Sequence, residues 1–350
     1  MSGGVGRAVR ALLITALLWS AACATGRGQP DWIDGSAAAY PKDRYLIGVG
    51  EGADLDAAGD RARAEIARIF EVRIEDAVLD RSETVTVTEN ARRRSSIVER
   101  IAVETRTTTQ AALEGVEIAE IWKDTTAQRV YALAVLDARR AHRRLLERAA
   151  EREAEVAGLL ESAEAARGVL TEARARVGAA RGSRERDALL ARARVVGPVD
   201  PATLERGPAT AALERALAAA LARTDFAVRA RETDASGGGE LPGLRDALAA
   251  RLARMGFRAA DAGSPLAELQ VDCRLALLRI ERGGAGWLHY RWEGACDVAD
   301  ASGVVLSAAH AGSESHPVDG TARTKARARA ERVLAEAVER ELQRYLYGEE

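Results

Sequence analysis

The sequence predicts an α+β protein made of two small α/β two-layer domains joined by a helical hairpin. Two separate regions contain segments that alternate apolar and polar residues, which is typical of half-buried strands. In both regions other segments carry apolar residues at helical spacing, so each sheet has a helix to cover it. Between the two regions lies a long stretch with a continuous helical pattern. A length of 350 residues agrees with two domains.

The amino terminus is typical of a signal peptide. Arg7 and Arg10 precede an apolar run, residues 11–19, which is too short to span a bilayer as a helix. The run ends in Ser20-Ala21-Ala22-Cys23, which resembles the lipobox of bacterial lipoproteins except at Ser20, where Leu is usual. We therefore expect cleavage before Cys23 and acylation of its thiol, with palmitate among the chains. An ordinary secretory signal, cut at the same place, is the alternative.

These features predict a lipid-anchored protein that faces the periplasm. Ala24 follows the cysteine where an Asp would favour inner-membrane retention, so we expect the outer membrane. The formal net charge is -2, which argues against a nucleic-acid partner. The predicted boundaries are a signal peptide at 1–22, a lipidated tether at 23–35, an α+β domain at 36–138, a helical hairpin linker at 139–197 and a second α/β domain at 198–350.

In the first domain, a strand at 45–49 leads to a helix that Asp54 is placed to cap. The apolar face of this helix consists of Leu55, Ala58, Ala62, Ile66 and Ile69. Val72 with Ile74, and Val85 with Val87, alternate with polar residues and predict two paired strands. Residues 91–113 are interpreted as a helix. Segments 116–122 and 130–136 predict a hairpin that ends the domain.

Several short motifs in this domain resemble the lipoprotein-20 family over about residues 30–146. The residues that carry the resemblance are Pro30, Trp32, Tyr45 to Gly50, Ala57, Ala62, Ala64, Leu113 to Val116, Trp122 and Tyr131 to Asp137. The same module is similar to the amino-terminal domain of flagellar assembly protein T. The resemblance implies an α+β envelope module without known catalysis, and it names no substrate or partner.

The linker has apolar residues at spacings of three, four and seven, which predicts a helical hairpin. Gly178 to Ser183 is the expected break between its helices. An Ala-rich seam with Gly158 and Gly168 favours packing against the protein's own domain, and a coiled-coil oligomerisation arm is the alternative.

The second domain is predicted to place helices around a three-stranded antiparallel meander. A helix over 213–221 leads to a strand at 226–228, and a helix over 244–255 precedes the meander. The strands of the meander are expected at 269–280, 287–298 and 304–311, followed by a covering helix at 321–347.

The first two strands of this meander can be placed in register from the sequence alone. Centring the turn between Gly284 and Ala285 sets Cys273 opposite Cys296 and brings the two apolar faces together. Opposed strand residues have the β-carbon spacing that a disulfide needs, and the periplasm is oxidising. We therefore predict a Cys273–Cys296 disulfide, with two reduced core cysteines as the alternative.

Patterns that would indicate catalysis, a metal or a cofactor are weak. Gly48, Gly50 and Gly52 between a strand and a helix suggest a dinucleotide loop, but their spacing is GxGxG and a tight turn accounts for them. The histidines, which are His142, His289, His310 and His316, lack metal-ligand spacing. Arg92 to Arg94 are interpreted as a solvated loop, with contact to anionic lipid as the alternative. We predict no catalytic residues, no cofactor and no metal site.

The sequence therefore favours a non-enzymatic, lipid-anchored protein of the cell envelope that docks onto a flagellar, secretion or cell-wall complex. A binding module for an envelope glycan or lipid is the alternative. Exposed aromatic or strand-edge surface would favour docking, whereas a closed apolar pocket with converging polar groups would favour a ligand.

Overall fold

The computed structural model describes residues 29–82, 114–233, 239–260, 264–280 and 286–348. Cys23, the predicted strand at Val85 and Val87, the predicted helix over 91–113 and Arg92 to Arg94 lie outside these residues. The described chain divides into two compact units, 1–145 with 191–198 and 146–190 with 199–350. In those residues no helix is both long and apolar enough to cross a membrane.

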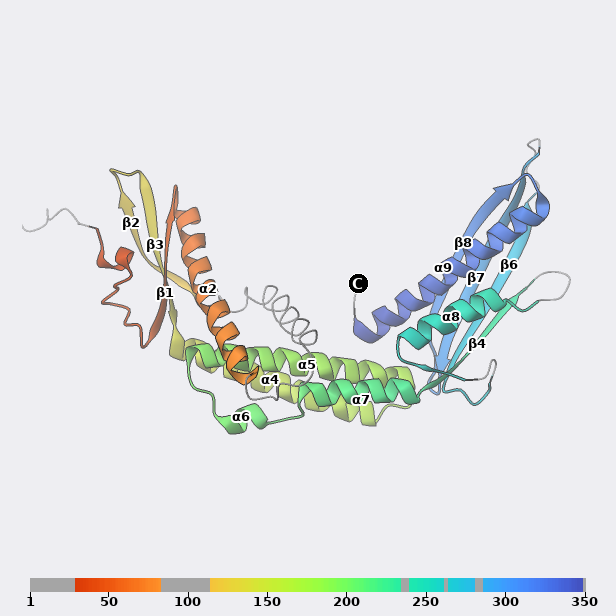
Figure 1. The fold of residues 1–350 in the computed structure, drawn as a ribbon, viewed down its shortest axis with the longest axis horizontal. Helices are drawn as coiled ribbons and strands as arrows, with labels where there is room; N and C mark the ends of the chain where they lie inside the picture. Colours follow the sequence, from red (N-terminus) through yellow and green to blue (C-terminus); the bar gives the residue numbers. More distant parts are fainter. Residues whose placement is uncertain (1–28, 83–113, 234–238, 261–263, 281–285, 349–350) are drawn as a thin grey trace, which may run out of the picture. The chain divides into compact units, whose positions relative to one another are not determined.

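The first unit is a three-stranded antiparallel sheet with one helix on one face (Figure 1). A 3-10 turn, η1 (Asp31–Asp34), precedes β1 (Tyr45–Gly52), α2 (Leu55–Ser82), β2 (Glu117–Asp124) and β3 (Arg129–Asp137). The strand order is β1-β3-β2, so β3 is central. The predicted α+β class and the predicted strands β1, β2 and β3 are confirmed.

Helix α2 begins where the sequence indicates and continues further than expected. Asp54 accepts a hydrogen bond from the backbone N–H of Ala57 at 2.8 Å, as a capping residue should. Val72 and Ile74, predicted to form a strand, are instead in α2, and Val72 is 51% exposed. Four alternating residues are too few to define a strand, and extending an existing helix is much easier than starting a new element.

The three glycines of β1 lie along the strand and not in a turn, which corrects the sequence-based interpretation. A β-carbon added to Gly48, Gly50 or Gly52 would lie 2.1–2.5 Å from the backbone of α2 at Ala58 or Ala62. Only glycine permits this close contact between strand and helix. The helix backbone fills the space that a dinucleotide loop would need for phosphate.

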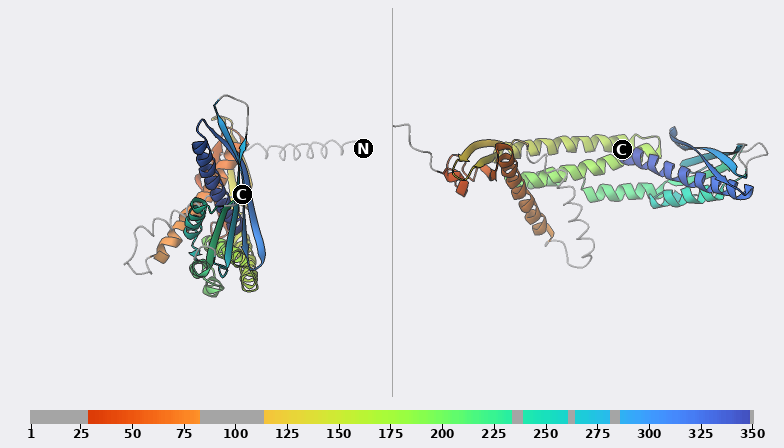
Figure 2. Two further views of the ribbon diagram at one scale, coloured as in Figure 1. Left: turned by 90° about the vertical axis from the view of Figure 1, so that its right-hand side faces the viewer. Right: turned by 90° about the horizontal axis from the view of Figure 1, so that it is seen from above.

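In the second unit, the long helices of the predicted hairpin are α4 (Ala138–Glu164) and α5 (Val169–Val196), both of which begin or end in the first unit. Over residues 146–190 they run side by side (Figure 2). Val156 on α4 and Ala179 and Ala180 on α5 bury against Leu213 of α7 (Thr210–Arg223), which follows the short α6 (Pro201–Glu205). The hairpin thus packs within its own unit.

The break between α4 and α5 is at Ala165 to Gly168, so the predicted break at Gly178 to Ser183 is wrong. Gly178 instead permits close packing, because a β-carbon there would lie 3.2 Å from the side chain of Leu159. The true turn is held by Asp300, whose carboxylate accepts a hydrogen bond from the N–H of Leu170 at 3.1 Å.

The second unit also contains a five-stranded sheet, where the sequence predicts a three-stranded meander. Its elements are β4 (Asp225–Glu232), α8 (Pro242–Arg254), β5 (Arg258–Ala259), β6 (Leu269–Ile280), β7 (Leu288–Asp300), β8 (Gly303–His316) and α9 (Asp319–Tyr347). The order is β5-β4-β6-β7-β8, with β4 parallel to β5 and β6. Strands β6, β7 and β8 form the expected meander, and the predicted strand at 226–228 extends the sheet beyond it.

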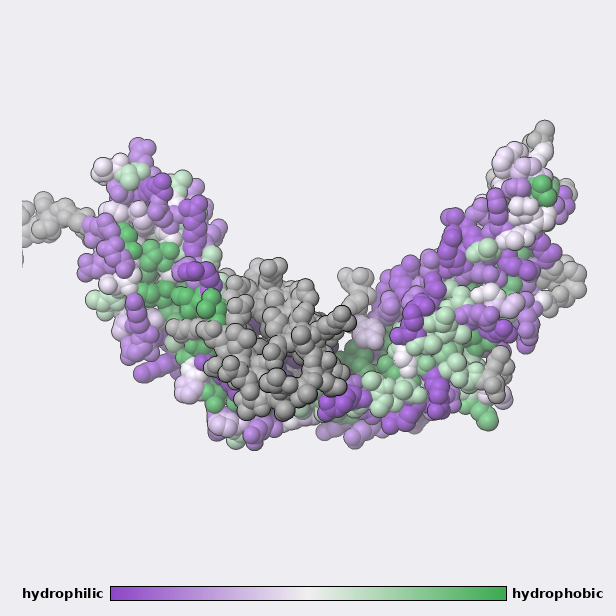
Figure 3. All heavy atoms as spheres, in the orientation of Figure 1, coloured by the Kyte–Doolittle hydropathy of each residue, from purple (hydrophilic) through white to green (hydrophobic). Residues whose placement is uncertain are grey.

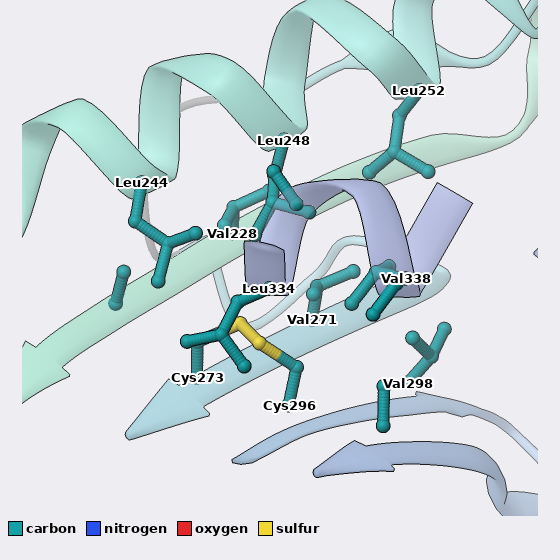
Figure 4. Close-up of a cluster of buried hydrophobic side chains, with 14 of the residues drawn as sticks. Val228, Leu244, Leu248, Leu252, Val271, Cys273, Cys296, Val298, Leu334 and Val338 are labelled. Atoms are coloured by element: carbon teal, nitrogen blue, oxygen red, sulfur yellow. A yellow bond between two sulfur atoms is a disulfide. The ribbon is translucent and has the colours of Figure 1, made fainter. Parts of the chain in front are cut away.

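The predicted register of β6 and β7 is confirmed, with Cys273 opposite Cys296 and Leu277 opposite Trp292. The two cysteines form a disulfide, and both are at most 2% exposed. Figure 4 shows the bond between the sheet and Leu334 and Val338 of α9. A cross-link that closes a loop of this length stabilises the fold by about 3 kcal/mol through the entropy of the unfolded chain.

Helices α8 and α9 cover one face of this sheet, and the outer side of α9 is a hydrophilic surface (Figure 3). The residues that α9 buries follow a helical repeat and include Ala326, Ala330, Leu334, Val338 and Leu342. The predicted covering helix is confirmed.

We expect Gly50→Ala to destabilise the first unit by about 3 kcal/mol, because the new methyl group would overlap the backbone of α2. Gly59→Ala is the matched control. The nearest atom to its added β-carbon is the flexible end of Arg63 at 3.4 Å, so the better helix propensity of Ala should leave stability unchanged or raise it by about 1 kcal/mol. Thermal unfolding followed by circular dichroism checks both variants. Equal stability of the two would contradict the close-packing account.

Candidate functional site

The face of the first sheet opposite α2 carries a concentration of aromatic side chains. We call this surface the aromatic face, and its rings are Trp32, Tyr40, Tyr45, Trp122 and Tyr131. Only 4% of the residues in the whole chain are aromatic, so three rings on the strands and two in the segment before β1 are a marked enrichment. Aliphatic residues of the same strands, Ile47 and Val49, lie among the rings and are partly buried.

The amino-terminal segment before β1 covers part of the aromatic face. Trp32 of η1 is 4% exposed and packs on Leu133 and Val135 of the central strand. Its indole N–H donates a hydrogen bond to the Glu120 carboxylate at 2.8 Å. The turn ends at Gly35, whose φ of 81° is in the left-handed region that favours glycine. The segment is thereby fixed to the sheet at one buried indole.

The remaining rings are only partly covered. Tyr40 and Tyr45 meet edge to face, with ring centroids 5.4 Å apart, and Trp122 and Tyr131 lie on neighbouring strands at 5.5 Å. Arg44 lies over the ring of Tyr45 at 5.1 Å. Aromatic residues and Arg are both enriched at protein interfaces relative to the rest of the protein surface. The arrangement suits contact with another macromolecule.

The second sheet differs, because its open face is crossed by ion pairs. Arg274 bonds Asp297 at 3.0 Å, and Asp297 also accepts a hydrogen bond from the Ser307 hydroxyl at 2.6 Å. A hollow of about 570 Å³ on this face is lined by small and charged residues, including Ala276, Arg291 and Ala309. It is open to solvent, and its lining lacks the large apolar side chains that usually hold a small ligand.

His289 and His310, which are on the neighbouring strands β7 and β8, do not lie opposite each other. His289 on β7 is opposite Ser315, whose hydroxyl lies 2.5 Å from its Nδ1, whereas His310 on β8 is opposite Gly294. Among the described residues, no three His, Cys, Asp or Glu side chains are grouped so that they could hold a metal ion.

The three-stranded sheet and α2 form a two-layer α+β module, and the aromatic face is the side of the sheet that α2 leaves open. Comparison with known families shows which family this module resembles. Residues 30–137 match the family described as LPP20 lipoprotein, which confirms the resemblance found in the sequence. The match spans β1, α2, β2 and β3 and ends at the last residue of β3. The first unit therefore contains a module that is similar to the LPP20 lipoprotein family.

Two solved structures give weak likenesses. A secreted protein of Helicobacter pylori is 13% identical and covers 83% of this chain and 97% of its own, with a TM-score of 0.41. A minor lipoprotein of Acinetobacter baumannii is 11% identical and covers 36% of this chain and 93% of its own, with a TM-score of 0.22. At these values neither likeness establishes a shared function. No curated protein matches the chain.

Outside the matched residues, a buried carboxylate joins β4 to α9, and no sequence motif indicated this contact. Glu232 is 3% exposed and accepts hydrogen bonds from Arg323 at 2.8 Å and from Arg327. Burial of Glu232 could be recognised only after β4 had been placed beside β6. Pairing with two guanidinium groups offsets the cost of burying its charge.

Glu331 lies one helical turn beyond Arg327 and is also partly buried. Desolvation raises the pKa of its carboxyl group above the usual value, and the negative charge of Glu232 adds to this effect. The unfolded chain therefore loses the Glu331 proton at a lower pH than the folded chain does. Stability must then decrease as the pH rises from about 4.5 through the pKa of the folded state.

We expect Glu331→Gln to unfold at a higher temperature than the wild type at pH 7 and at nearly the same temperature at pH 4, because glutamine has no proton to lose. Glu336→Gln is the control, since the Glu336 side chain is 54% exposed, and its effect should be small at both pH values. Thermal melts across this pH range provide the measurement. A Glu331→Gln variant that is less stable than wild type at pH 7 would overturn the assignment.

Proposed function

We propose that the protein is a lipid-anchored component of the bacterial cell envelope, held by acylated Cys23 at the outer membrane and facing the periplasm. In this proposal it has no catalytic role and docks another envelope protein through the aromatic face. The partly exposed rings beside the buried Trp32 are the observation that carries the proposal. The match of residues 30–137 to LPP20 lipoproteins supports the lipid anchor.

The short distance along the chain between Cys23 and Trp32 links the anchor to the docking surface. Trp32 is nine residues after Cys23, and even a fully extended chain of that length reaches only about 30 Å. Because Trp32 is buried in the first unit, the aromatic face is confined to a layer next to the membrane. A partner that is itself bound to the envelope would therefore meet it at a raised local concentration.

A glycan or lipid ligand is the second candidate, since aromatic rings also pack on such molecules. The structure gives it less support, because the partly exposed rings lie on a sheet face and the hollow of the second unit is open and lined by small and charged residues. In the docking proposal the partner is a protein of a flagellar, secretion or cell-wall complex.

The anchor is tested by Cys23→Ser. Without the thiol no acyl chain can be attached, so we expect the variant to leave the membrane fraction and to appear as soluble protein or uncleaved precursor. Fractionation of cells followed by immunoblotting measures this. If the variant were processed and still partitioned fully with membranes, lipid at Cys23 could not be what holds the protein there.

The docking surface is tested by placing a photo-crosslinking phenylalanine derivative at Tyr131 in the full-length protein in living cells. We expect a defined protein adduct from this position. The same group at Asp60, whose side chain on α2 is 81% exposed, should give little or none. A glycan or lipid adduct at Tyr131 without a protein adduct would favour the ligand-binding alternative, and equal adducts at both positions would contradict docking through the aromatic face.

A further inference from the structure

Strand β8 forms one edge of the second sheet and leaves a long row of backbone groups unpaired among the described residues. It runs over Gly303–His316, and β7 is its only strand neighbour in the described sheet. Ser307, Ala309, Ala311 and Ser313 are all exposed. The opposite edge of the sheet is β5, which spans only two residues. Of the two edge strands of this sheet, β8 is therefore much the longer.

The middle of β8 lacks the features that usually keep edge strands from pairing. Residues 307–313 read Ser-Ala-Ala-His-Ala-Gly-Ser and contain no Lys, Arg, Asp, Glu or Pro. The irregularity in its pairing with β7 lies near its start, opposite Val298 and Ala299. By contrast, the edge strand β2 of the first sheet carries four charged residues and a bulge. An edge such as that of β8 favours pairing with another strand.

The disulfide spacing shows which residues of β8 direct their backbone groups outward. The Cα atoms of Cys273 and Cys296 are 4.1 Å apart, which is the spacing of a non-hydrogen-bonded pair. Cys296 must then form its hydrogen bonds with its other neighbour, Ala308. Because the pattern alternates along a strand, the N–H and C=O groups of Ala309 and Ala311 point to the free edge.

We propose that β8 pairs antiparallel with β8 of a second copy of this chain, about a two-fold axis at His310. The sequence on either side of His310 is nearly symmetric, as Ala309 matches Ala311 and Ser307 matches Ser313. Each exposed residue would meet a small uncharged residue of the partner copy, and its outward backbone groups would form about two hydrogen bonds per pair. Such self-complementarity is the requirement of a two-fold interface.

Charge does not oppose this pairing. The nearest carboxylate on the strand, Glu314, lies 3.2 Å from Arg329 of α9 and would be opposite Leu306 of the other copy. An interface of one strand pair is small compared with the roughly 1,200–2,000 Å² buried by stable complexes. The dimer is therefore weak in dilute solution, and attachment of both copies to one membrane would increase its population.

The experiment uses His310→Cys in the full-length protein, made in cells and treated with a mild oxidant. Both copies of residue 310 would lie at the axis as a directly opposed, non-hydrogen-bonded pair, which brings their β-carbons within reach of a disulfide. We expect a reducible dimer on gels. Ser313→Cys is the matched control, because its two copies would be about 20 Å apart along the strands, and it should give at most a trace.

Two further variants distinguish edge pairing from random collision. Adding Ala309→Lys and Ala311→Lys to His310→Cys places charge on both sides of the axis and should reduce the dimer at least tenfold without affecting folding, since both sites are exposed. Co-expressed Ser307→Cys and Ser313→Cys chains should cross-link to each other. No dimer from His310→Cys with its thiol open to maleimide, equal dimer from Ser313→Cys, or an adduct with a different protein would each overturn the proposal.

Discussion

Within the part of the chain that the structure describes, each sheet is covered by helices on one face only, and that constraint determines how the rest of the structure is organised. The covered faces are closely packed. In the first unit the backbone of α2 contacts the glycines of β1, and in the second unit α9 packs on the Cys273–Cys296 disulfide. The uncovered faces must be compatible with water or with a partner. The two units meet this requirement in different ways.

The second sheet has charged residues on its open face, where ion pairs such as Arg274 with Asp297 keep it solvated. The first sheet has aromatic residues there, and a short amino-terminal segment fixed by Trp32 covers them only in part. Burial of apolar area on binding would favour a partner on the aromatic face of the first sheet far more than on the charged open face of the second sheet. This asymmetry is why we propose docking through the first unit, which also lies closer along the chain to Cys23.

Features that depend on local pattern could be predicted from the sequence, and features that depend on distant contacts could not. The register of Cys273 and Cys296 follows from alternation and one turn, so it was predictable. The α4–α5 turn depends on Asp300, which is 130 residues from Leu170, and no local signal marks it. Gly178 is a residue type that often ends helices, but here it lies inside α5 and permits close packing against Leu159 of α4. The aromatic residues were visible as single motifs, yet only the strand order β1-β3-β2 brings them to one face.

Hydrogen exchange of the protein in isolated envelopes, compared with the purified protein in detergent, tests docking through the aromatic face most directly. The account predicts that the envelope adds protection to residues 30–49 and to β2 and β3, while the exchange of α9 and of the inner strand β6 changes little. Identical exchange of the first unit in both preparations would contradict it, as would added protection confined to the second unit.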